Sequence, residues 1–159
     1  MDWAKPTRIL LRSMIKESFP ELSVKRIVLW SFGLGPFWGT SWWLLPWVRI
    51  IIVTHKSRDI SHMALMGLLA HELSHQVVYR RYFWIRYVFR TPWIYIFRKD
   101  LIKGEEAQVD KVVMERGFGR HLCVLTKIID QDPDHERVKK YYFTPTEIEA
   151  YCQENKFKF

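Results

Sequence analysis

The chain has 159 residues, of which 48% are apolar and 26% are charged, so it is neither disordered nor of low complexity. Lys and Arg outnumber Asp and Glu by 25 to 17, and the net charge of +8 favours an anionic partner without selecting nucleic acid, phospholipid or an acidic substrate. Two cysteines cannot form a disulfide framework, so we expect reduced thiols in a single-domain cytoplasmic protein.

The first predicted elements are a helix and two strands. Apolar residues recur at helical spacing over residues 7–19, and Pro20 follows. Residues 24–32 and 48–54 are rich in β-branched and aromatic side chains, which predicts a strand in each. Between them, residues 33–46 are rich in Trp and interrupted by glycine and proline, so we expect an aromatic loop there.

Neither a membrane span nor a secretory signal is predicted. Residues 27–48 carry no charge and are long enough to cross a bilayer, but the glycines and prolines among them interrupt any spanning helix. The first 18 residues carry charges throughout, which is not typical of a signal peptide.

A longer helix is predicted to begin at Ser57 or Asp59, either of which can cap it, and to extend to about Tyr79. Apolar side chains recur along it at steps of three and four, which predicts a stripe facing the core. These residues are Met63, Met66, Ala70, Leu73 and Val77.

Three further helices are predicted after a basic and aromatic insert at residues 80–103. Two of them span residues 105–116 and 120–129. Thr144 and Glu147 have the spacing of a capping box, so a short last helix should follow and extend through Tyr151.

The motif HExxH lies on the predicted longer helix. His71 and His75 are four residues apart, so both imidazoles project from one face and can bind a single ion. Glu72 is rotated by about 100° from His71, where it can reach a water on that ion without being a ligand. We therefore predict a zinc site in which Glu72 is catalytic.

Catalytic zinc uses three protein ligands and one open position, so a third ligand is needed. A pattern HExxHxxGxxH is excluded, because Val78 and Arg81 stand where it needs glycine and histidine. Glu106 and Asp110, four apart on the next helix, can supply a ligand and a carboxylate that orients a ligand histidine. Glu105 is the rival ligand, but Val109 follows it at that spacing, so Glu106 is preferred.

The strings HELSH and EEAQVDKVVMERGFG resemble the gluzincin zinc metallopeptidases. They are most similar to the soluble minigluzincins, which are akin to the CAAX-prenyl-protease and heat-shock membrane metallopeptidases, and the resemblance covers residues 48–129. It implies an α+β zincin-like peptidase domain, with a small antiparallel β-ribbon over a mainly helical body. It further implies that His71, His75 and Glu106 bind one zinc ion, with Glu72 as general base and Asp110 in support.

The predicted strand at 48–54 resembles the edge strand on which these peptidases place an extended substrate. Its predicted substrate-binding residues are Arg49, Ile50, Ile51, Ile52, Val53 and Thr54. Hydrolysis also needs a donor to the oxyanion, and the sequence does not choose among several. The candidates are Tyr79, His121, His135, Tyr141 and Tyr142.

Two alternative functions stay open. A protease similar to the DNA-associated SprT-like enzymes would use His121 in place of Glu106 as third ligand. A non-catalytic basic module would bind a membrane or nucleic acid, with zinc structural or vestigial. His55 and His62 flank the motif off its HExxH face and are expected to be surface residues.

The insert and the tail have open roles. Residues 80–103 contain seven Lys or Arg and one Asp among aromatic residues, which suits an anchor at an anionic membrane surface or, less favoured, a single-stranded nucleic-acid site. Packing of its aromatic side chains against the Trp-rich loop is the alternative that we favour over both. Within one domain we expect residues 1–56 to hold the first helix and β-ribbon and 57–131 the active-site helices. Residues 132–159 form a tail that could plug the cleft, as in latent minigluzincins.

Overall fold

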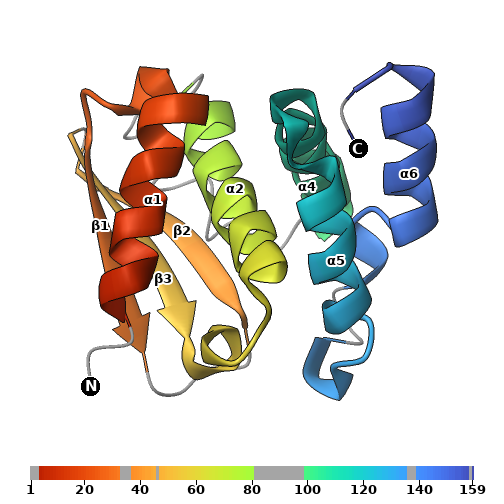
Figure 1. Cartoon of the computed structure of the whole chain (residues 1–159), viewed down its shortest axis with the longest axis horizontal. Coiled ribbons are helices and arrows are strands. Elements are labelled where there is room, and N and C mark those ends of the chain that lie inside the picture. The colour runs from red at the N-terminus through yellow and green to blue at the C-terminus, as the bar shows by residue number, and fades with distance from the viewer. Residues whose placement is uncertain (1–3, 33–36, 46, 81–98, 136–138, 158) are drawn as a thin grey trace.

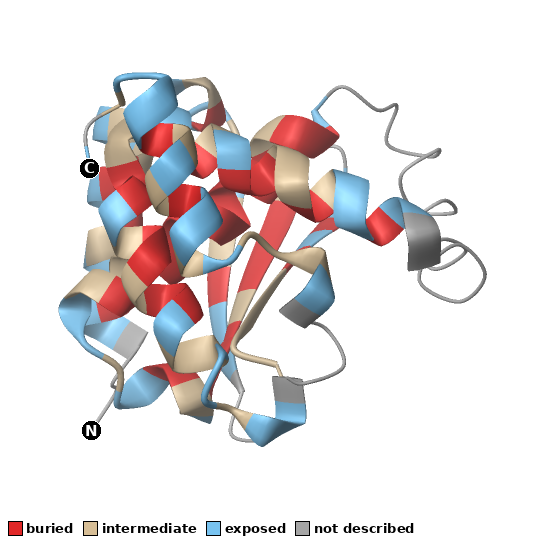
Figure 2. Cartoon of the chain, turned by 90° about the vertical axis from the view of Figure 1, so that its right-hand side faces the viewer, coloured by how far each residue is buried: buried red, intermediate tan, exposed pale blue. Residues whose placement is uncertain are grey.

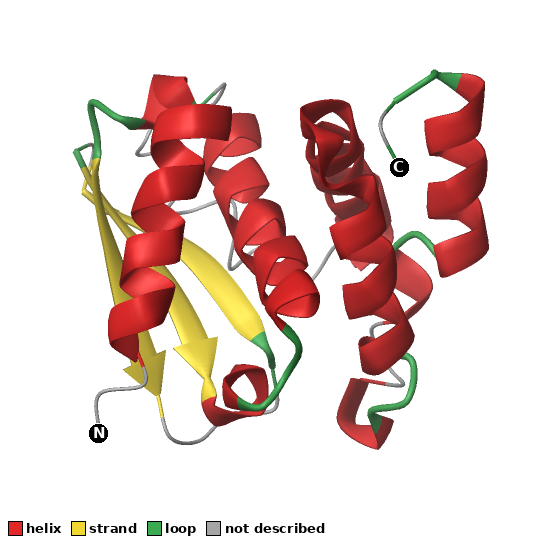
Figure 3. Ribbon diagram, viewed as in Figure 1, coloured by secondary structure: helices red, strands yellow, loops and turns green. Residues whose placement is uncertain are grey.

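The computed structural model describes residues 4–32, 37–45, 47–80, 99–135, 139–157 and 159. A small sheet lies at one side of the molecule, with α1 and α2 beside it and α4, α5 and α6 beyond α2 (Figure 1). Helices and strands are both present, which confirms the α+β class (Figure 3).

The first helix, α1, spans Ala4–Ser18 and begins three residues earlier than its apolar pattern indicates. Its buried residues Leu11 and Met14 join the main core, together with Phe19, which follows the helix. A short 3-10 turn, Pro20–Leu22, then leads the chain to the sheet.

The sheet has three strands in the order β1–β3–β2, where β1 is Arg26–Phe32, β2 is Gly39–Leu45 and β3 is Val48–Thr54. Strands β2 and β3 are antiparallel, but β1 is parallel to β3, so the expected antiparallel ribbon is wrong in this respect.

The expected aromatic loop is also wrong for β2. Its side chains alternate, with Ser41 and Trp43 buried and Trp42 and Leu44 exposed, which is the pattern of a strand with one face on the core. The glycines and prolines that suggested a loop lie at or outside the ends of this strand. Because Trp occupies both an exposed and a buried position of β2, and Leu its other exposed positions, no charged residue marks the outer face in the sequence.

Strand β3 has the predicted bounds, but it is the central strand and not an edge. Both of its sides are paired, so a peptide cannot add to it through main-chain hydrogen bonds. The side chain of Arg49 is buried and donates from Nη1 to the carbonyl of Gln76 at 2.7 Å, which is a structural role. The prediction that Arg49, Ile50, Ile51, Ile52, Val53 and Thr54 form the substrate strand is therefore wrong.

Helix α2 spans His62–Tyr79 and begins at Ser61, whose hydroxyl accepts from the backbone N–H of Ala64. Ser57 is part of a 3-10 turn, His55–Arg58, so neither predicted cap is used. Helix α2 packs between the sheet on one side and α4 and α5 on the other, and residues 67–76 are buried on every face. Of the predicted stripe, Ala70 and Leu73 are fully buried, and Met66 and Val77 are partly buried and pack against the main core.

The chain resumes in helix α4, Lys99–Val113, which begins six residues before the predicted start. A π turn, Met114–Phe118, in which Gly117 has a φ of 81°, leads into α5, Gly119–Ile129. The capping box of Thr144 and Glu147 is confirmed at the start of α6, Pro145–Glu154. Most of the basic insert, residues 81–98, lies outside the described residues.

Buried residues line the strands and the facing sides of the helices (Figure 2). One main core joins α1, the sheet, α2, α5 and α6, and a smaller cluster of Trp43, Val78, Tyr79 and Val109 lies where β2, α2 and α4 meet. Both cysteines are buried and free. Among the described residues, no helix is long and apolar enough to cross a membrane.

Candidate metal centre

The last turn of α2 is fixed to the sheet immediately after the HExxH motif. Gln76 is fully buried, and its side-chain amide donates to the hydroxyl of Ser41 on β2. The backbone carbonyl of Gln76 accepts a hydrogen bond from Arg49 on β3. The guanidinium of Arg49 also lies 4.5 Å from the centre of the Trp43 ring. These contacts set how the two histidines face the neighbouring helix.

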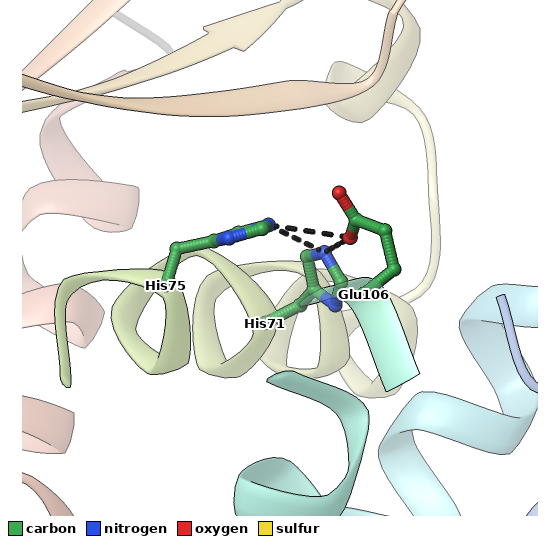
Figure 4. Close-up of side chains that lie close together, drawn as sticks. All are labelled: His71, His75 and Glu106. Carbon is green, nitrogen blue, oxygen red and sulfur yellow. Dashed lines mark hydrogen bonds and ion pairs between the residues drawn. The ribbon is translucent and has the colours of Figure 1, made fainter. Parts of the chain in front are cut away.

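His71, His75 and Glu106 meet at one point between α2 and α4 (Figure 4). The two Nε2 atoms are 3.1 Å apart, and Oε2 of Glu106 is 3.3 Å from that of His71 and 3.4 Å from that of His75. Tetrahedral zinc with bonds of about 2.0–2.1 Å places its ligand atoms about 3.3–3.4 Å apart. The three donor atoms therefore have the spacing of one face of such a tetrahedron.

Asp110 lies one helical turn after Glu106 and orients the first histidine. Its Oδ1 is 2.9 Å from Nδ1 of His71, and its Oδ2 accepts from the backbone N–H of Phe143 at 3.2 Å. A proton held on Nδ1 by this carboxylate leaves the Nε2 lone pair directed at the other two donors. The predicted supporting role of Asp110 fits this geometry. The second histidine is stacked on Tyr79, with ring centres 5.3 Å apart.

The buried charges of the centre shift each other's protonation. Burial would raise the pKa of Glu106, but His75 and His71 outweigh it and lower that pKa strongly. Burial would lower the pKa of His71, but Asp110 and Glu106 outweigh it and raise that pKa well above its usual value. Two carboxylates around one imidazole thus favour positive charge at this point, which is the condition for binding a cation.

Glu72 is buried beside the centre but is not one of the converging donors. Burial raises the pKa of its carboxyl group, and the nearby His75 and His71 oppose this rise. Its Oε2 has no hydrogen-bond partner among the described residues. A buried carboxylate with a free oxygen next to a candidate metal site is suited to accept a proton from a substrate or water.

A cavity of about 520 Å³ opens next to His71 and Glu72, between the start of β2, α2, α5 and the segment before α6. Much of its wall is apolar and includes Trp38, Leu68, Leu122, Leu125, Ile129 and Phe143. Trp38 is held by a hydrogen bond from its indole N–H to Asp132 at 2.9 Å, and Lys56 donates to the same carboxylate oxygen at 2.7 Å.

The described candidates for the oxyanion donor lie at different distances from the cavity. Tyr142 lines the cavity, and its ring centre is 5.7 Å from that of His71. Tyr79 packs on the far side of the centre against His75. Tyr141 does not line the cavity, and the side chain of His135 lies outside the described residues.

His121 does not join the converging donors, so the structure gives no support to its role as third ligand. Burial lowers its pKa, and so do His62, at the start of α2, and Arg120. Glu105 is not among the donors either, whereas Glu106 is. His55 and His62 are exposed, as predicted.

The C-terminal segment has two parts with different surroundings. Helix α6 packs into the main core through Ile148 and Cys152, both fully buried. The segment before it instead contacts the candidate site, through Tyr142 beside His71 and the Phe143 amide on Asp110, and Lys140, Tyr142, Phe143 and Thr144 line the cavity without filling it. The inhibitory role of the tail stays a prediction.

Sequence reasoning missed Gly39 and Gln76, which fix the site from the sheet side. A glycine between Trp38 and a run of alternating residues was a signal for the start of a strand in close contact with another group. Gln76 directly follows the motif, but nothing in the sequence shows that its partners are Ser41 and Arg49.

Comparison with known proteins gives no match to this chain from any family model, any curated protein or any solved structure.

Proposed function

We propose that this chain is a zinc-dependent endopeptidase of the gluzincin type. The observation that carries the proposal is the convergence of two imidazole nitrogens and one carboxylate oxygen, from His71, His75 and Glu106, at 3.1–3.4 Å. This donor set of two histidines and one glutamate, with a fourth position left for water, is that of catalytic zinc, whereas structural zinc is closed by four protein ligands.

The chemistry would be hydrolysis of a peptide bond. Zinc, when bound, supplies a Lewis acid that makes water acidic near neutral pH and polarises a carbonyl group. Glu72 would accept the proton of the attacking water and pass it to the leaving amine. Its raised pKa supports this role, because the carboxyl group must hold the proton between the two transfers. Tyr142 is our candidate for the oxyanion donor, since it lies beside His71 and lines the cavity.

Strand β2 replaces β3 as our candidate for the substrate strand. Among the described strands it pairs only with β3. Its first residue, Gly39, lies so close to Glu72 that an added β-carbon would be 2.8 Å from Oε1 of that carboxylate. An extended peptide could add to the outer edge of β2 by main-chain hydrogen bonds, which implies modest sequence selectivity. The apolar cavity beside Glu72 favours a substrate with a bulky apolar side chain next to the cleaved bond.

The test is a pair of variants with zinc content and hydrolysis measured separately. Glu72→Gln should bind one zinc ion per chain and keep its fold but lose at least about 10³-fold in kcat on a casein or peptide substrate. Glu106→Ala should lose both zinc and activity. Glu105→Gln is the matched control, because it changes the neighbouring glutamate on the same helix, and it should keep both.

The outcomes separate the proposal from its alternatives. If the wild type and Glu72→Gln both bind zinc and neither hydrolyses any substrate, a non-catalytic binding module would be favoured. Zinc retained in Glu106→Ala but lost in His121→Ala would favour the SprT-like ligand set. Either result would overturn the proposed mechanism.

A further inference from the structure

Large apolar side chains are exposed along the second half of β2 and at the turn into β3, and none of them is a donor of the candidate metal centre. Trp47 is 61% exposed, Leu44 55% and Trp42 46%, and Leu45 is also exposed. We call these four residues the hairpin tip. Such a patch is larger than single scattered surface residues and indicates a contact surface.

Basic side chains adjoin the hairpin tip. The backbone N–H of Arg26 donates to the carbonyl of Trp47 at 3.1 Å, and Arg26 pairs with Val48 in the sheet. Arg26 and Lys25 also line a surface hollow of about 500 Å³ together with Arg12 and Lys16 of α1. We call these four cations the basic hollow. Val24, next to Lys25, is 79% exposed.

Charge in the basic hollow is not neutralised within the described part of the chain. None of its four cations forms an ion pair with a described carboxylate. Lys5 and Arg8 continue the exposed basic side of α1 towards its start. A cationic surface therefore lies directly against an apolar one, and the net charge of +8 adds to its attraction for anions.

We propose that the hairpin tip and the basic hollow together bind the surface of a membrane that contains anionic phospholipid. Tryptophan favours the headgroup layer, aliphatic side chains beside it can enter the acyl boundary, and Lys and Arg attract anionic headgroups. A nucleic acid would use the cations and could stack on Trp, but it gives no partner to Leu44, Leu45 or Val24. This proposal does not depend on the proposed hydrolase activity.

The location of the surface determines what a bound membrane would do. Gly39, beside Glu72, and Leu45, at the hairpin end, are the first and last residues of β2 and lie about 20 Å apart at about 3.3 Å per residue, so the candidate metal centre would lie within about 20 Å of the membrane surface. The centre would then be presented to chains that emerge close to the bilayer, without being covered by it.

The test is flotation of the full chain with vesicles of 70% phosphatidylcholine and 30% phosphatidylserine, compared with pure phosphatidylcholine. The wild type should bind the anionic vesicles at least about tenfold more tightly than the neutral ones. Lys25→Gln with Arg26→Gln should weaken binding about 25-fold, since each basic residue near the surface is worth about fivefold. Trp47→Ala should weaken it about tenfold through lost apolar burial, and Leu44→Ser serves as a second tip variant.

The matched control is Arg86→Gln with Arg90→Gln, which removes the same charge from the basic insert. This control should lose no more than a few-fold, and circular dichroism should show that every variant is folded. Binding that is lost in the control but kept in the Lys25 and Arg26 variant would overturn the proposal in favour of the insert. Equal binding to neutral vesicles would overturn it as well.

Two competitors separate the other partners. Displacement by 10 mM inorganic phosphate alone would identify a site for free anions and not for a membrane. A single-stranded oligonucleotide that binds equally well after Leu44→Ser, and that displaces the vesicles completely, would identify a nucleic-acid surface. We expect that neither competitor displaces the vesicles and that Trp47→Ala and Leu44→Ser each weaken vesicle binding.

Discussion

Gly39 leaves the space that the carboxylate of Glu72 occupies. A β-carbon at position 39 would lie 2.8 Å from Oε1 of Glu72 and 3.1 Å from Cδ1 of Leu68. The first residue of β2 therefore passes over the proposed general base at backbone distance, and only glycine allows this approach without movement. The edge strand and the base are thus fixed relative to each other.

Gly39→Ala should displace the Glu72 carboxylate while leaving the three metal donors in place. Because a shift of about 1 Å in a reacting group can cost about 100-fold in rate, we expect a similar loss in kcat with zinc content unchanged. The measurement is steady-state hydrolysis together with metal analysis. An unchanged kcat would show that Glu72 does not need this position.

Gly104→Ala is the control for that substitution, because nothing lies within 4 Å of a β-carbon added there. Gly104 is exposed in the interior of α4, so alanine should raise the free energy of unfolding by about 0.5–1 kcal/mol and leave hydrolysis unchanged.

Asp110→Asn should weaken zinc binding about 10–100-fold, because the amide no longer holds the proton of His71 on Nδ1 as a carboxylate does. Competition with a chromophoric chelator at pH 7 measures the affinity. Asp59→Asn is the control, since that carboxylate is 88% exposed. Equal affinity in the two variants would contradict an orienting role for Asp110.

The contact between Lys56 and Asp132 predicts a loss of stability in acid. Partial burial would raise the pKa of Asp132, but hydrogen bonds from Lys56, the Asp134 backbone and Trp38 lower it from 3.8 to about 2. Ionised Asp132 thus stabilises the fold fully above about pH 4, and this contribution is lost as the pH falls towards 2. Urea unfolding at pH 5 and pH 2.5 should show a larger loss for the wild type than for Asp132→Asn. Parallel losses would contradict the prediction.

Tyr142→Phe tests the proposed oxyanion donor. Loss of one such donor typically lowers kcat about 10²–10³-fold, and we expect that loss with little change in KM. Tyr141→Phe removes the hydroxyl of the neighbouring residue, which does not line the cavity, and should have no effect. A similar rate for both variants would exclude Tyr142 as the donor.

Ile148→Ala tests whether the last helix is part of the fold. Ile148 is fully buried in the main core, so its truncation should cost about 2–5 kcal/mol in unfolding free energy. Deletion of the tail from Lys140 would remove this residue and Cys152, so we expect the shortened chain to be unstable. A shortened chain that keeps its unfolding midpoint and hydrolyses faster would instead support an inhibitory tail.

The candidate site was more predictable than the sheet that frames it. The spacing of four between His71 and His75, and between Glu106 and Asp110, fixes their faces on helices without knowledge of the fold. The positions of β2 and β3 in the sheet depend on which strands pair. The alternation of an exposed Trp42 with a buried Trp43 indicates that β2 is a strand, but it does not indicate which strand lies beside β2. Strand β3 was misread as an edge strand, although a continuous apolar run is typical of a strand buried on both faces, as β3 largely is.

The two oxygens of Asp110 contact different parts of the chain, one the ring of His71 and the other the amide of Phe143. Any coupling between ion binding at the candidate centre and the position of the C-terminal segment would therefore pass through Asp110, and each would change the other by the same factor. In that case, a protein that drew residues 140–144 away from the body would also weaken ion binding, so release of the segment and loss of the metal would be two effects of one event.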